Sequence, residues 1–343
     1  MRIAIVTPKG PASTSGNWTT ADRWARLLRE LGHETTVRGS WEGEDAEILI
    51  ALHARRSHSS IARFAVTHPD RPLIVALTGT DLYRDIREDE SAQKSLDLAH
   101  RLIVLQECGP DELTPEHRAR TRVIYQSAPA AAPRKPDPEG LTVCVLGNLR
   151  PEKDPFRAAL AARLLPEESG VRVLHAGSAE SEGYEEAATE HEKKIARYRW
   201  LGPAKPEEAL ELLGRSHALV QSSVMEGGAN AVGEAMAAGV PVLASDIPGN
   251  AGMLGRDYPG YYSTGDERAL ANLMRRAETD TDFYERLRRE VQSRAHLVSR
   301  ERERGSLAAL VEEFPRKRRP PRYTRRMSER ERIRLTKYST KAG

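Results

Sequence analysis

Short, uninterrupted apolar runs recur along the chain, and stretches with apolar residues at helical spacing lie between many of them. Such a run is typical of a parallel strand covered on both faces, because neither side of the strand meets water. The predicted strands are 2–6, 48–52, 73–77, 102–105, 123–125, 141–146, 171–174, 218–221 and 240–244. The predicted helices are 19–31, 156–165, 207–213, 229–238, 267–276 and 283–298. This alternation predicts an α/β protein with parallel sheets.

A proline-rich segment, 128–140, interrupts the alternation and should form an extended linker. We therefore expect an N-terminal Rossmann-like domain at 1–127 and a second such domain at 141–298, facing each other across a cleft. A helix at 299–314 is expected to return to the first domain. The remaining residues, 315–343, are expected to form a basic, flexible tail.

A chain of 343 residues, 39% apolar and 30% charged, is long enough for two globular domains. The net charge of +3 is uneven, because 315–343 holds 12 Lys/Arg and 2 Asp/Glu, leaving 41 basic and 48 acidic residues in 1–314. Such a tail attracts the phosphates of nucleic acids or membranes. It lacks a base-reading motif, so we expect small-molecule substrates, no nucleic-acid partner and no stable membrane association. The oligomeric state is left open.

Cysteine usage and hydropathy indicate the compartment. Cys108 and Cys144 lie far apart without metal-type spacing, which favours a reducing environment. No stretch approaches the length of a membrane span, and the first residues are too weakly apolar for a signal peptide. We expect a cytoplasmic protein.

Asp280 and Asp282 match a carboxylate pattern of metal-dependent transferases, but Asp280 precedes a predicted helix and is better explained as its N-cap.

Two carboxylates, Glu226 and Glu234, lie eight residues apart around a glycine pair and the start of the predicted helix 229–238. On one continuous helix this spacing would place both on the same face. The free N–H groups at a helix start suit a phosphate, and carboxylates suit sugar hydroxyls. The segment therefore predicts a sugar-nucleotide site, the alternative being a solvated loop with two surface carboxylates.

This pattern, with the Gly-Val-Pro-Val strand that follows, resembles the donor site of the retaining GT-B glycosyltransferases of family 4, the glycogen-synthase-like class. The resemblance implies a GT-B fold, with two Rossmann-like domains. It also implies that Glu226 lies near the transferring sugar and that Glu234 binds the ribose hydroxyls. The residues whose backbone amides would hold the diphosphate and sugar are Gly227, Gly228, Ala229, Asn230, Ala231 and Val232.

The loop after the first strand of the second domain carries two cations, Arg150 and Lys153. The carboxyl end of a parallel strand is a usual place for anion capture. In the family, such cations neutralise the departing diphosphate in place of a metal, so no cofactor or metal is expected. Lys153 aligns with the family lysine, whereas Arg150 lies two residues beyond the place of the family arginine, where this chain has Asn148. Gly177 resembles the glycine turn after the next strand.

The first domain carries candidates for the acceptor side. Gly16 and Asn17 match the family's glycine loop, which closes over the reacting sugar and diphosphate. His53 follows the second predicted strand, where it could orient a hydroxyl or accept a proton. We expect His53 to act in catalysis with Lys153, Arg150 and Glu226. The expected acceptor-binding residues are Asn17, His53, Arg55, Arg56, Thr80 and Asp81. Arg55 and Arg56 would bind an anion, the alternative being two surface arginines.

Several first-domain phrases, at 15–24, 51–57, 77–86 and 125–128, together resemble the selenosugar synthases of selenoneine biosynthesis. That resemblance implies transfer of a sugar from UDP-N-acetylglucosamine to the selenium of selenophosphate. No residue is assigned to the later loss of the phosphoryl group, and the anomeric outcome is open, because a direct attack would invert a centre that the family retains. Ordinary family-4 transfer from a nucleotide sugar to a small molecule or glycan is the alternative. A UDP-sugar epimerase or phosphorylase is a further one.

Overall fold

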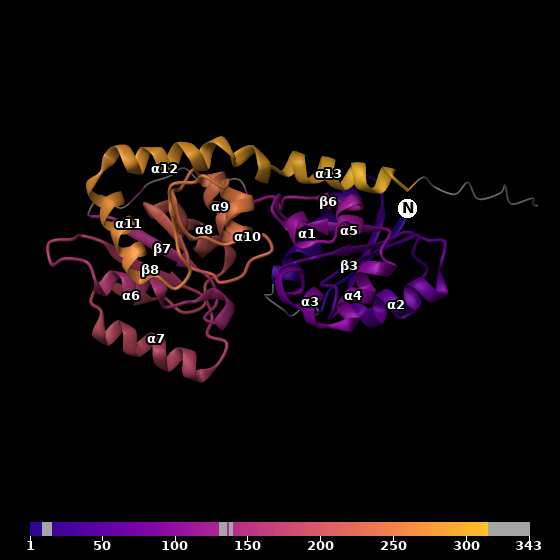
Figure 1. Ribbon diagram of the computed structural model, residues 1–343, viewed down its shortest axis with the longest axis horizontal. Coiled ribbons are helices and arrows are strands. Elements are labelled where there is room, and N and C mark those ends of the chain that lie inside the picture. Colours follow the sequence, from indigo (N-terminus) through magenta and orange to yellow (C-terminus); the bar gives the residue numbers. More distant parts are fainter. Residues whose placement is uncertain (9–15, 130–135, 137–139, 315–343) are drawn as a thin grey trace, which may run out of the picture.

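The computed structural model describes residues 1–8, 16–129, 136 and 140–314. They form two α/β domains, joined along one side by C-terminal helices that cross from one domain to the other (Figure 1). The predicted linker falls mostly on 130–135 and 137–139, and the predicted tail is 315–343. Both therefore lie mostly or wholly outside the described residues.

The first sheet has the strand order β2-β1-β3-β4-β5-β6, with every pairing parallel. Its strands are β1 Arg2–Val6, β2 Glu34–Arg38, β3 Ile48–Leu52, β4 Leu73–Ala76, β5 Arg101–Val104 and β6 Thr121–Val123. Neighbouring residues of one strand enter opposite cores: Ile3 and Ile5 lie in one cluster and Ala4 and Val6 in the other. This two-sided burial explains why the strands read as continuous apolar runs.

Helices cover both faces of the first sheet. The helical segments are α1 Gly16–Glu30, α2 His58–Thr67, the π-helical turn η1 Asp81–Asp85, α3 Ile86–Glu88, α4 Glu90–Leu98, the 3-10 turn η2 Gly109–Glu112 and α5 Pro115–Ala119. Trp24, Leu27 and Leu28 of α1 pack on one face. Phe64 of α2 and Leu96 of α4 pack on the other.

The second sheet has the order β12-β11-β10-β7-β8-β9, again all parallel. Its strands are β7 Thr142–Leu146, β8 Arg172–Ala176, β9 Tyr198–Trp200, β10 Ala218–Gln221, β11 Val242–Ser245 and β12 Tyr261–Tyr262. Counted within the domain, this is the 3-2-1-4-5-6 order of dinucleotide-binding folds, in reverse direction. Each sheet has a switch point where the chain reverses its direction of winding: between β1 and β3, and between β7 and β10.

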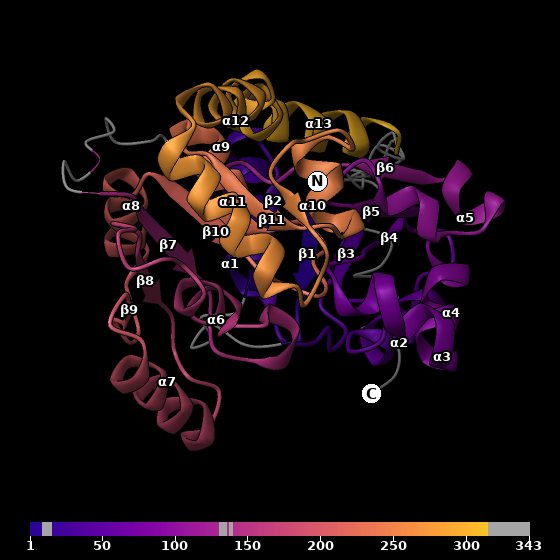
Figure 2. The ribbon, with the colours of Figure 1, turned by 60° about the vertical axis from the view of Figure 1, so that its left-hand side comes forward.

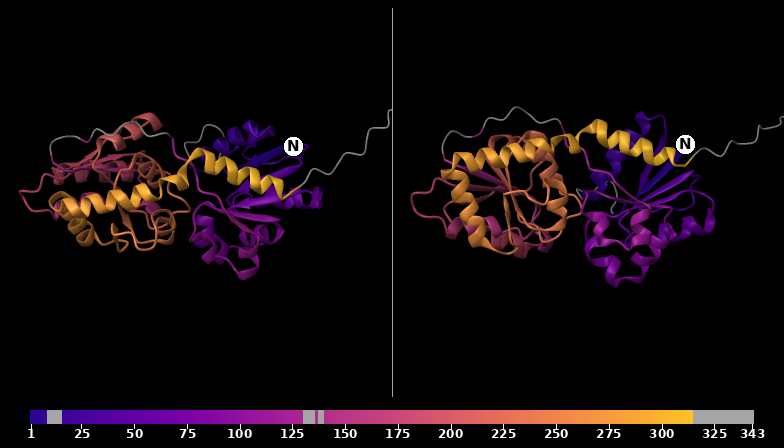
Figure 3. Two further views of the ribbon diagram at one scale, coloured as in Figure 1. Left: turned by 90° about the horizontal axis from the view of Figure 1, so that it is seen from above. Right: turned by 45° about the horizontal axis from the view of Figure 1, so that its top comes forward.

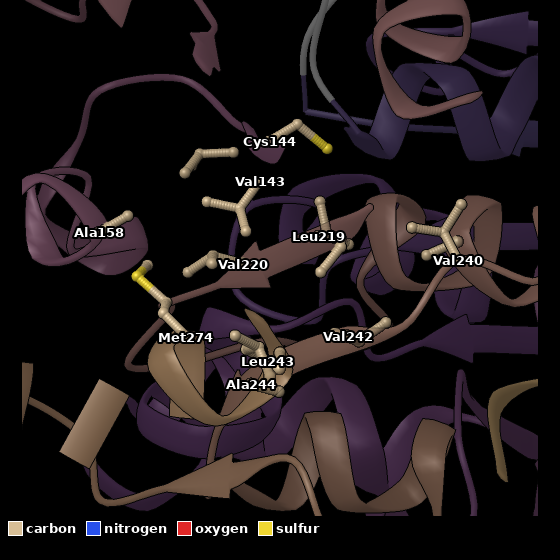
Figure 4. Close-up of a cluster of buried hydrophobic side chains, with 14 of the residues drawn as sticks. Val143, Cys144, Ala158, Leu219, Val220, Val240, Val242, Leu243, Ala244 and Met274 are labelled. Carbon is tan, nitrogen blue, oxygen red and sulfur yellow. The ribbon is translucent and has the colours of Figure 1, made fainter. Parts of the chain in front are cut away.

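One large core fills the second domain. The surrounding segments are the 3-10 turn η3 Pro151–Lys153, α6 Arg157–Arg163, α7 Glu182–Lys194, α8 Pro206–Arg215, α9 Asn230–Ala238, α10 Pro248–Leu254 and α11 Glu267–Thr279. Figure 2 brings this domain forward and shows α11 crossing in front of its strands. Figure 4 shows core side chains of the central strands, with Ala158 of α6 and Met274 of α11 beside them.

The chain then crosses back to the first domain through α12 Thr281–Ser293, the 3-10 turn η4 Ala295–Val298 and α13 Arg300–Glu312 (Figure 3). Leu307, Leu310 and Val311 of α13 belong to a core cluster of the first domain. The predicted N-cap is confirmed, because the Asp280 carboxylate accepts a hydrogen bond from the backbone N–H of Phe283 at the start of α12.

Every predicted strand and helix is present, with small shifts at the ends, but no ranges were predicted for α2, α4, α7 and α10. β2 was not predicted because the residues of this edge strand are mostly polar, and β9 and β12 were missed because they are very short. The strand expected at 123–125 lies at Thr121–Val123, and the helix expected at 283–298 is α12 followed by η4. Of the helices in the described part of the chain, none is both long and apolar enough to cross a membrane.

Candidate active site

The switch point of the second sheet brings Lys153 and Glu226 together. Lys153 ends η3, which follows β7, and Glu226 lies in the loop that follows β10. Their side chains form an ion pair, with Lys153 Nζ 2.5 Å from Glu226 Oε1. In open α/β sheets, ligands bind at the carboxyl ends of the strands at such a switch point. The two residues therefore meet where this fold takes its ligands.

Glu226 is buried and is held from two further sides. Gln221 Nε2 and Ser223 Oγ donate hydrogen bonds to its Oε1, at 2.9 and 2.6 Å. These two donors were not predicted from the sequence, although Gln221 ends a predicted strand and Ser223 follows it. Glu226 and Glu234 do not lie on one continuous helix, because α9 begins only at Asn230, close to the predicted start at 229. Glu226 instead lies in the loop before the helix, fixed by its neighbours.

The start of α9 has no side-chain cap. Its N-cap residue, Ala229, supplies no capping side chain, so the first backbone N–H groups of the helix are not satisfied in that way. These groups belong to the predicted set from Asn230 to Val232. With the positive end of the helix dipole, they suit a phosphate.

The glycine pair before α9 is required by the contact between the domains. A Cβ atom on Gly227 would lie 2.3 Å from the carbonyl oxygen of Thr78 in the first domain, and one on Gly228 would lie 2.8 Å from Leu105 Cβ. Only glycine allows such an approach without displacement of the chain. The predicted donor loop therefore lies directly against the turn after β4, which carries Thr80.

Glu234 lies on α9, one turn beyond the helix start, with its side chain partly buried. No hydrogen bond or ion pair holds its carboxyl group within the described residues. Burial raises the pKa of Glu234 to about 7, and the positive charge of Arg23 opposes this shift. A carboxyl group without a hydrogen-bond partner among the described residues is able to accept hydrogen bonds from hydroxyl groups.

The loop after β7 presents the second predicted cation. Arg150 is exposed, and its guanidinium makes no hydrogen bond or ion pair with any part of the chain that the structure describes. Gly177 serves packing, because a Cβ atom there would lie 1.9 Å from the Gly147 carbonyl oxygen. His175 is also a packing residue: it contacts Tyr198 Oη and the Gly147 carbonyl, and burial lowers its pKa to about 4.

On the acceptor side, His53 follows β3 with an unusual backbone. Its φ of 73° lies in the left-handed region, although it is not a glycine, and its side chain is buried. Its Nε2 atom lies 3.1 Å from Thr80 Oγ1, and its Nδ1 accepts from the backbone N–H of Arg56 at 3.4 Å. Burial lowers the pKa of His53. The charges of Asp81 and Asp85 raise this pKa, and those of Arg56 and Arg55 lower it further. His53 is therefore neutral at pH 7, with its hydrogen on Nε2.

Asp81 has a structural role in this turn. It is fully buried, and its carboxylate accepts hydrogen bonds from the backbone N–H groups of Ala54, Thr78 and Gly79 at 2.8 to 3.0 Å. These bonds tie the turn after β4 to the loop after β3. We therefore assign Asp81 to holding the turn that presents Thr80, in place of direct acceptor binding.

Gly16 and Asn17 open α1, with Asn17 partly buried. A Cβ atom on Gly16 would lie 3.7 Å from Asn230 Nδ2, so the start of α1 lies beside the start of α9. Gln126, which was not among the predicted site residues, is buried at the same junction. When the side-chain amide of Gln126 is oriented so that its oxygen and its nitrogen both have hydrogen-bond partners, the nitrogen donates to Asn230 Oδ1 at 3.2 Å and to the Gly228 carbonyl at 3.1 Å. Its place just after a predicted strand was the available signal.

The start of α1, the start of α9 and the turn that carries Thr80 thus meet at one junction between the two domains, next to the loop that holds Glu226. No group of three or more His, Cys, Asp or Glu side chains that could hold a metal ion occurs in 1–8, 16–129, 136 and 140–314. The absence of a metal or cofactor from the reaction remains a prediction. Cys108 and Cys144 are both buried and free.

Residues 130–294 match the family model described as "Glycosyl transferases group 1". This segment covers the whole second sheet, with Lys153, Glu226 and α9. The match therefore gives the second domain the sequence pattern of a glycosyltransferase group 1 domain. Selenosugar synthesis, which the first-domain phrases imply, is a finer assignment than this match makes.

Solved structures share the architecture over nearly the whole chain. HepE of Anabaena in complex with UDP-glucose has 15% identity and a TM-score of 0.72, with 92% of this chain and 100% of that chain covered. Sucrose-phosphate synthase of Thermosynechococcus elongatus has 15% identity and a TM-score of 0.73, covering 91% and 98%. A glycosyltransferase of Rickettsia africae has 12% identity and a TM-score of 0.66, covering 91% and 97%. At these identities the likeness establishes the fold, and the chain has the predicted GT-B architecture.

Proposed function

We propose that this protein transfers the sugar of UDP-N-acetylglucosamine to the selenium atom of selenophosphate, which gives a selenosugar for selenoneine biosynthesis. The observation that carries the proposal is the contact of Gly227 with Thr78, because it joins the donor loop to the loops that bear Thr80, His53 and the arginines. A nucleotide sugar held on α9 would therefore have its anomeric carbon near a cationic acceptor site. HepE has been solved with UDP-glucose and with UDP, which supports a UDP-sugar donor.

The donor half acts through charge and hydrogen bonding. The diphosphate is held by the N–H groups at the start of α9, and the positive charges of Lys153 and Arg150 stabilise it as it leaves. Glu226, whose position Gln221 and Ser223 fix, accepts hydrogen bonds from the sugar hydroxyls. Glu234 accepts from the ribose.

The acceptor half needs cations and donors more than a general base, because selenophosphate is anionic and already nucleophilic. Arg55 and Arg56 attract its oxygens, and Asn17 and Thr80 offer hydrogen bonds. A selenium lone pair forms the new bond to the anomeric carbon while the bond from that carbon to the UDP oxygen breaks, and UDP leaves with the electron pair. Water then cleaves the selenium–phosphorus bond, releasing inorganic phosphate and the selenol.

The deciding experiment incubates the purified protein with UDP-N-acetylglucosamine, with and without selenophosphate, and follows UDP and selenium-containing products by mass spectrometry. We expect selenophosphate-dependent release of UDP, and proton NMR of the product would give its anomeric configuration. UDP release with hydroxyl acceptors alone would overturn the selenium assignment and leave an ordinary glycosyltransferase. A protein that neither binds nor consumes any UDP-sugar would refute the whole proposal.

A further inference from the structure

We propose that Arg55 and Arg84, both oriented by the buried carboxylate of Asp85, form a two-arginine site for a tetrahedral oxyanion. Its assignment to the phosphoryl end of the acceptor rests on the function proposed above. The site itself follows from the geometry of three residues, two of which, Arg84 and Asp85, the sequence did not single out.

Asp85 holds one arginine with each of its oxygens. Arg55 Nε lies 2.9 Å from Oδ2, and Arg84 Nε lies 3.2 Å from Oδ1. The carboxylate is only 4% exposed, whereas the two arginine side chains are 39% and 41% exposed. Each guanidinium is therefore anchored from the inside and reaches outward to solvent.

This arrangement leaves the outer edges of both guanidiniums available. Each arginine uses Nε for Asp85, and neither makes another side-chain hydrogen bond within the described part of the chain. The terminal nitrogens of a guanidinium carry four N–H bonds in a fixed fork, which matches the oxygens of a phosphate-type group. Two such forks fixed on one carboxylate can bind one oxyanion from two directions.

The charge balance of the cluster also favours an anion. The cluster contains three positive side chains, Arg55, Arg84 and the exposed Arg56, and two negative ones, Asp85 and Asp81. The Asp81 carboxylate already accepts hydrogen bonds from three backbone N–H groups. His53 adds no positive charge, because its pKa is lowered. One arginine is enough to neutralise the buried carboxylate of Asp85, so the second arginine leaves an excess positive charge beside it.

The backbone connects this cluster to the junction of the two domains. The left-handed turn at His53 directs the chain to Arg55, and Arg84 and Asp85 lie in the π-helical segment η1, a geometry frequent at functional sites. Directly before η1 lies the turn that contains Thr78 and Gly79, which contacts Gly227 of the donor loop. The two-arginine site and the donor loop are thus joined by one short stretch of backbone.

Direct binding tests the site without turnover. Inorganic thiophosphate, a stable analogue of selenophosphate, is titrated calorimetrically into the full protein in the presence of UDP. We expect Arg84→Ala to weaken its binding about ten- to a hundredfold, the usual effect of losing hydrogen bonds to a charged group. The matched control is Arg87→Ala, an exposed arginine nearby that pairs with Glu112 instead. Equal affinities in the wild type and Arg84→Ala, or no binding to the wild type, would overturn the site.

Asp85→Asn gives a test of sign. Removal of a negative charge makes the cluster more positive, so simple attraction predicts tighter thiophosphate binding, whereas loss of orientation predicts weaker binding. We expect weaker binding, together with a higher KM for the acceptor and an unchanged KM for the UDP-sugar. Tighter binding would refute the positioning role of Asp85. Arg84→Ala, at a half-buried position, decides the site if Asp85→Asn does not fold.

The two proposals fail in different ways. Thiophosphate binding that depends on Arg84 in a protein that forms no selenosugar would keep the oxyanion site and remove its assignment to selenophosphate. Selenosugar formation with an unchanged acceptor KM in Arg84→Ala would keep the proposed function and remove the two-arginine site.

Discussion

The carboxyl group of Glu234 makes donor binding sensitive to pH. Its pKa is raised to about 7 by burial, from a usual value near 4.5, and the described residues give it no hydrogen-bond or ion-pair partner. In the proposed donor complex, ribose hydroxyls donate to the ionised carboxylate, so only the ionised form binds well. With a pKa of 7, the ionised fraction rises from roughly 0.1 at pH 6 to about 0.9 at pH 8, which strengthens binding about tenfold.

Calorimetric titration with a UDP-sugar measures this effect, because the diphosphate of a UDP-sugar has no group that titrates between pH 6 and pH 8. Glu234→Gln is the matched control, since it keeps the shape but cannot ionise. We expect the affinity of the wild type to rise about tenfold from pH 6 to pH 8 and that of Glu234→Gln to stay constant. The same pH dependence in both proteins, or none in the wild type, would refute the assignment of Glu234 to the ribose.

Three further changes test the site and its support. Lys153→Ala should lower kcat about a hundredfold or more, because a charge on the leaving diphosphate is lost. Steady-state kinetics should show no such loss for the control Lys193→Ala, which removes a lysine charge at an exposed position on α7. An equal loss of kcat in both variants would contradict a specific role for Lys153. Gly227→Ala should lower kcat/KM about a hundredfold by forcing the domains apart at Thr78, whereas the same change at the uncrowded Gly183 should have no effect. Glu303→Gln should reduce the free energy of unfolding by about 3 kcal/mol in denaturant titrations, because it leaves the Arg23 guanidinium without its buried partner. An unchanged unfolding midpoint would contradict that reasoning.

The elements of the central sheets were predictable because their chemistry repeats along the chain. A strand such as β3 Ile48–Leu52, buried at every position, can only appear as an apolar run. The polar edge strand β2 carries no such signal, because one side of an edge strand faces solvent and requires no apolar residue. Local pattern is therefore informative where burial is complete and silent where burial is partial.

The site divides in the same way. Lys153 and Glu226 were found from the sequence because each follows a predictable strand and belongs to a recognisable motif. Arg84, Asp85 and Gln126 were not, since their importance arises from contacts across loops that no periodicity describes. Asp81 matched a motif but lies inside the turn, because the sequence identifies a carboxylate without showing which groups bind it.

The return of α13 to the first domain changes the order in which this protein can be built. Its Leu307, Leu310 and Val311 complete a core cluster whose other members come from 3–124. During synthesis, the first domain leaves the ribosome with that apolar groove uncovered, and it stays so until the entire second domain has been made. The backbone N–H of Ala128 then bonds the carbonyl of Val298 at 3.0 Å, which joins the two places where the chain passes between the domains. A fragment ending before α13 would therefore expose this apolar surface to other chains, and the need for chaperones should last throughout the synthesis of the second domain.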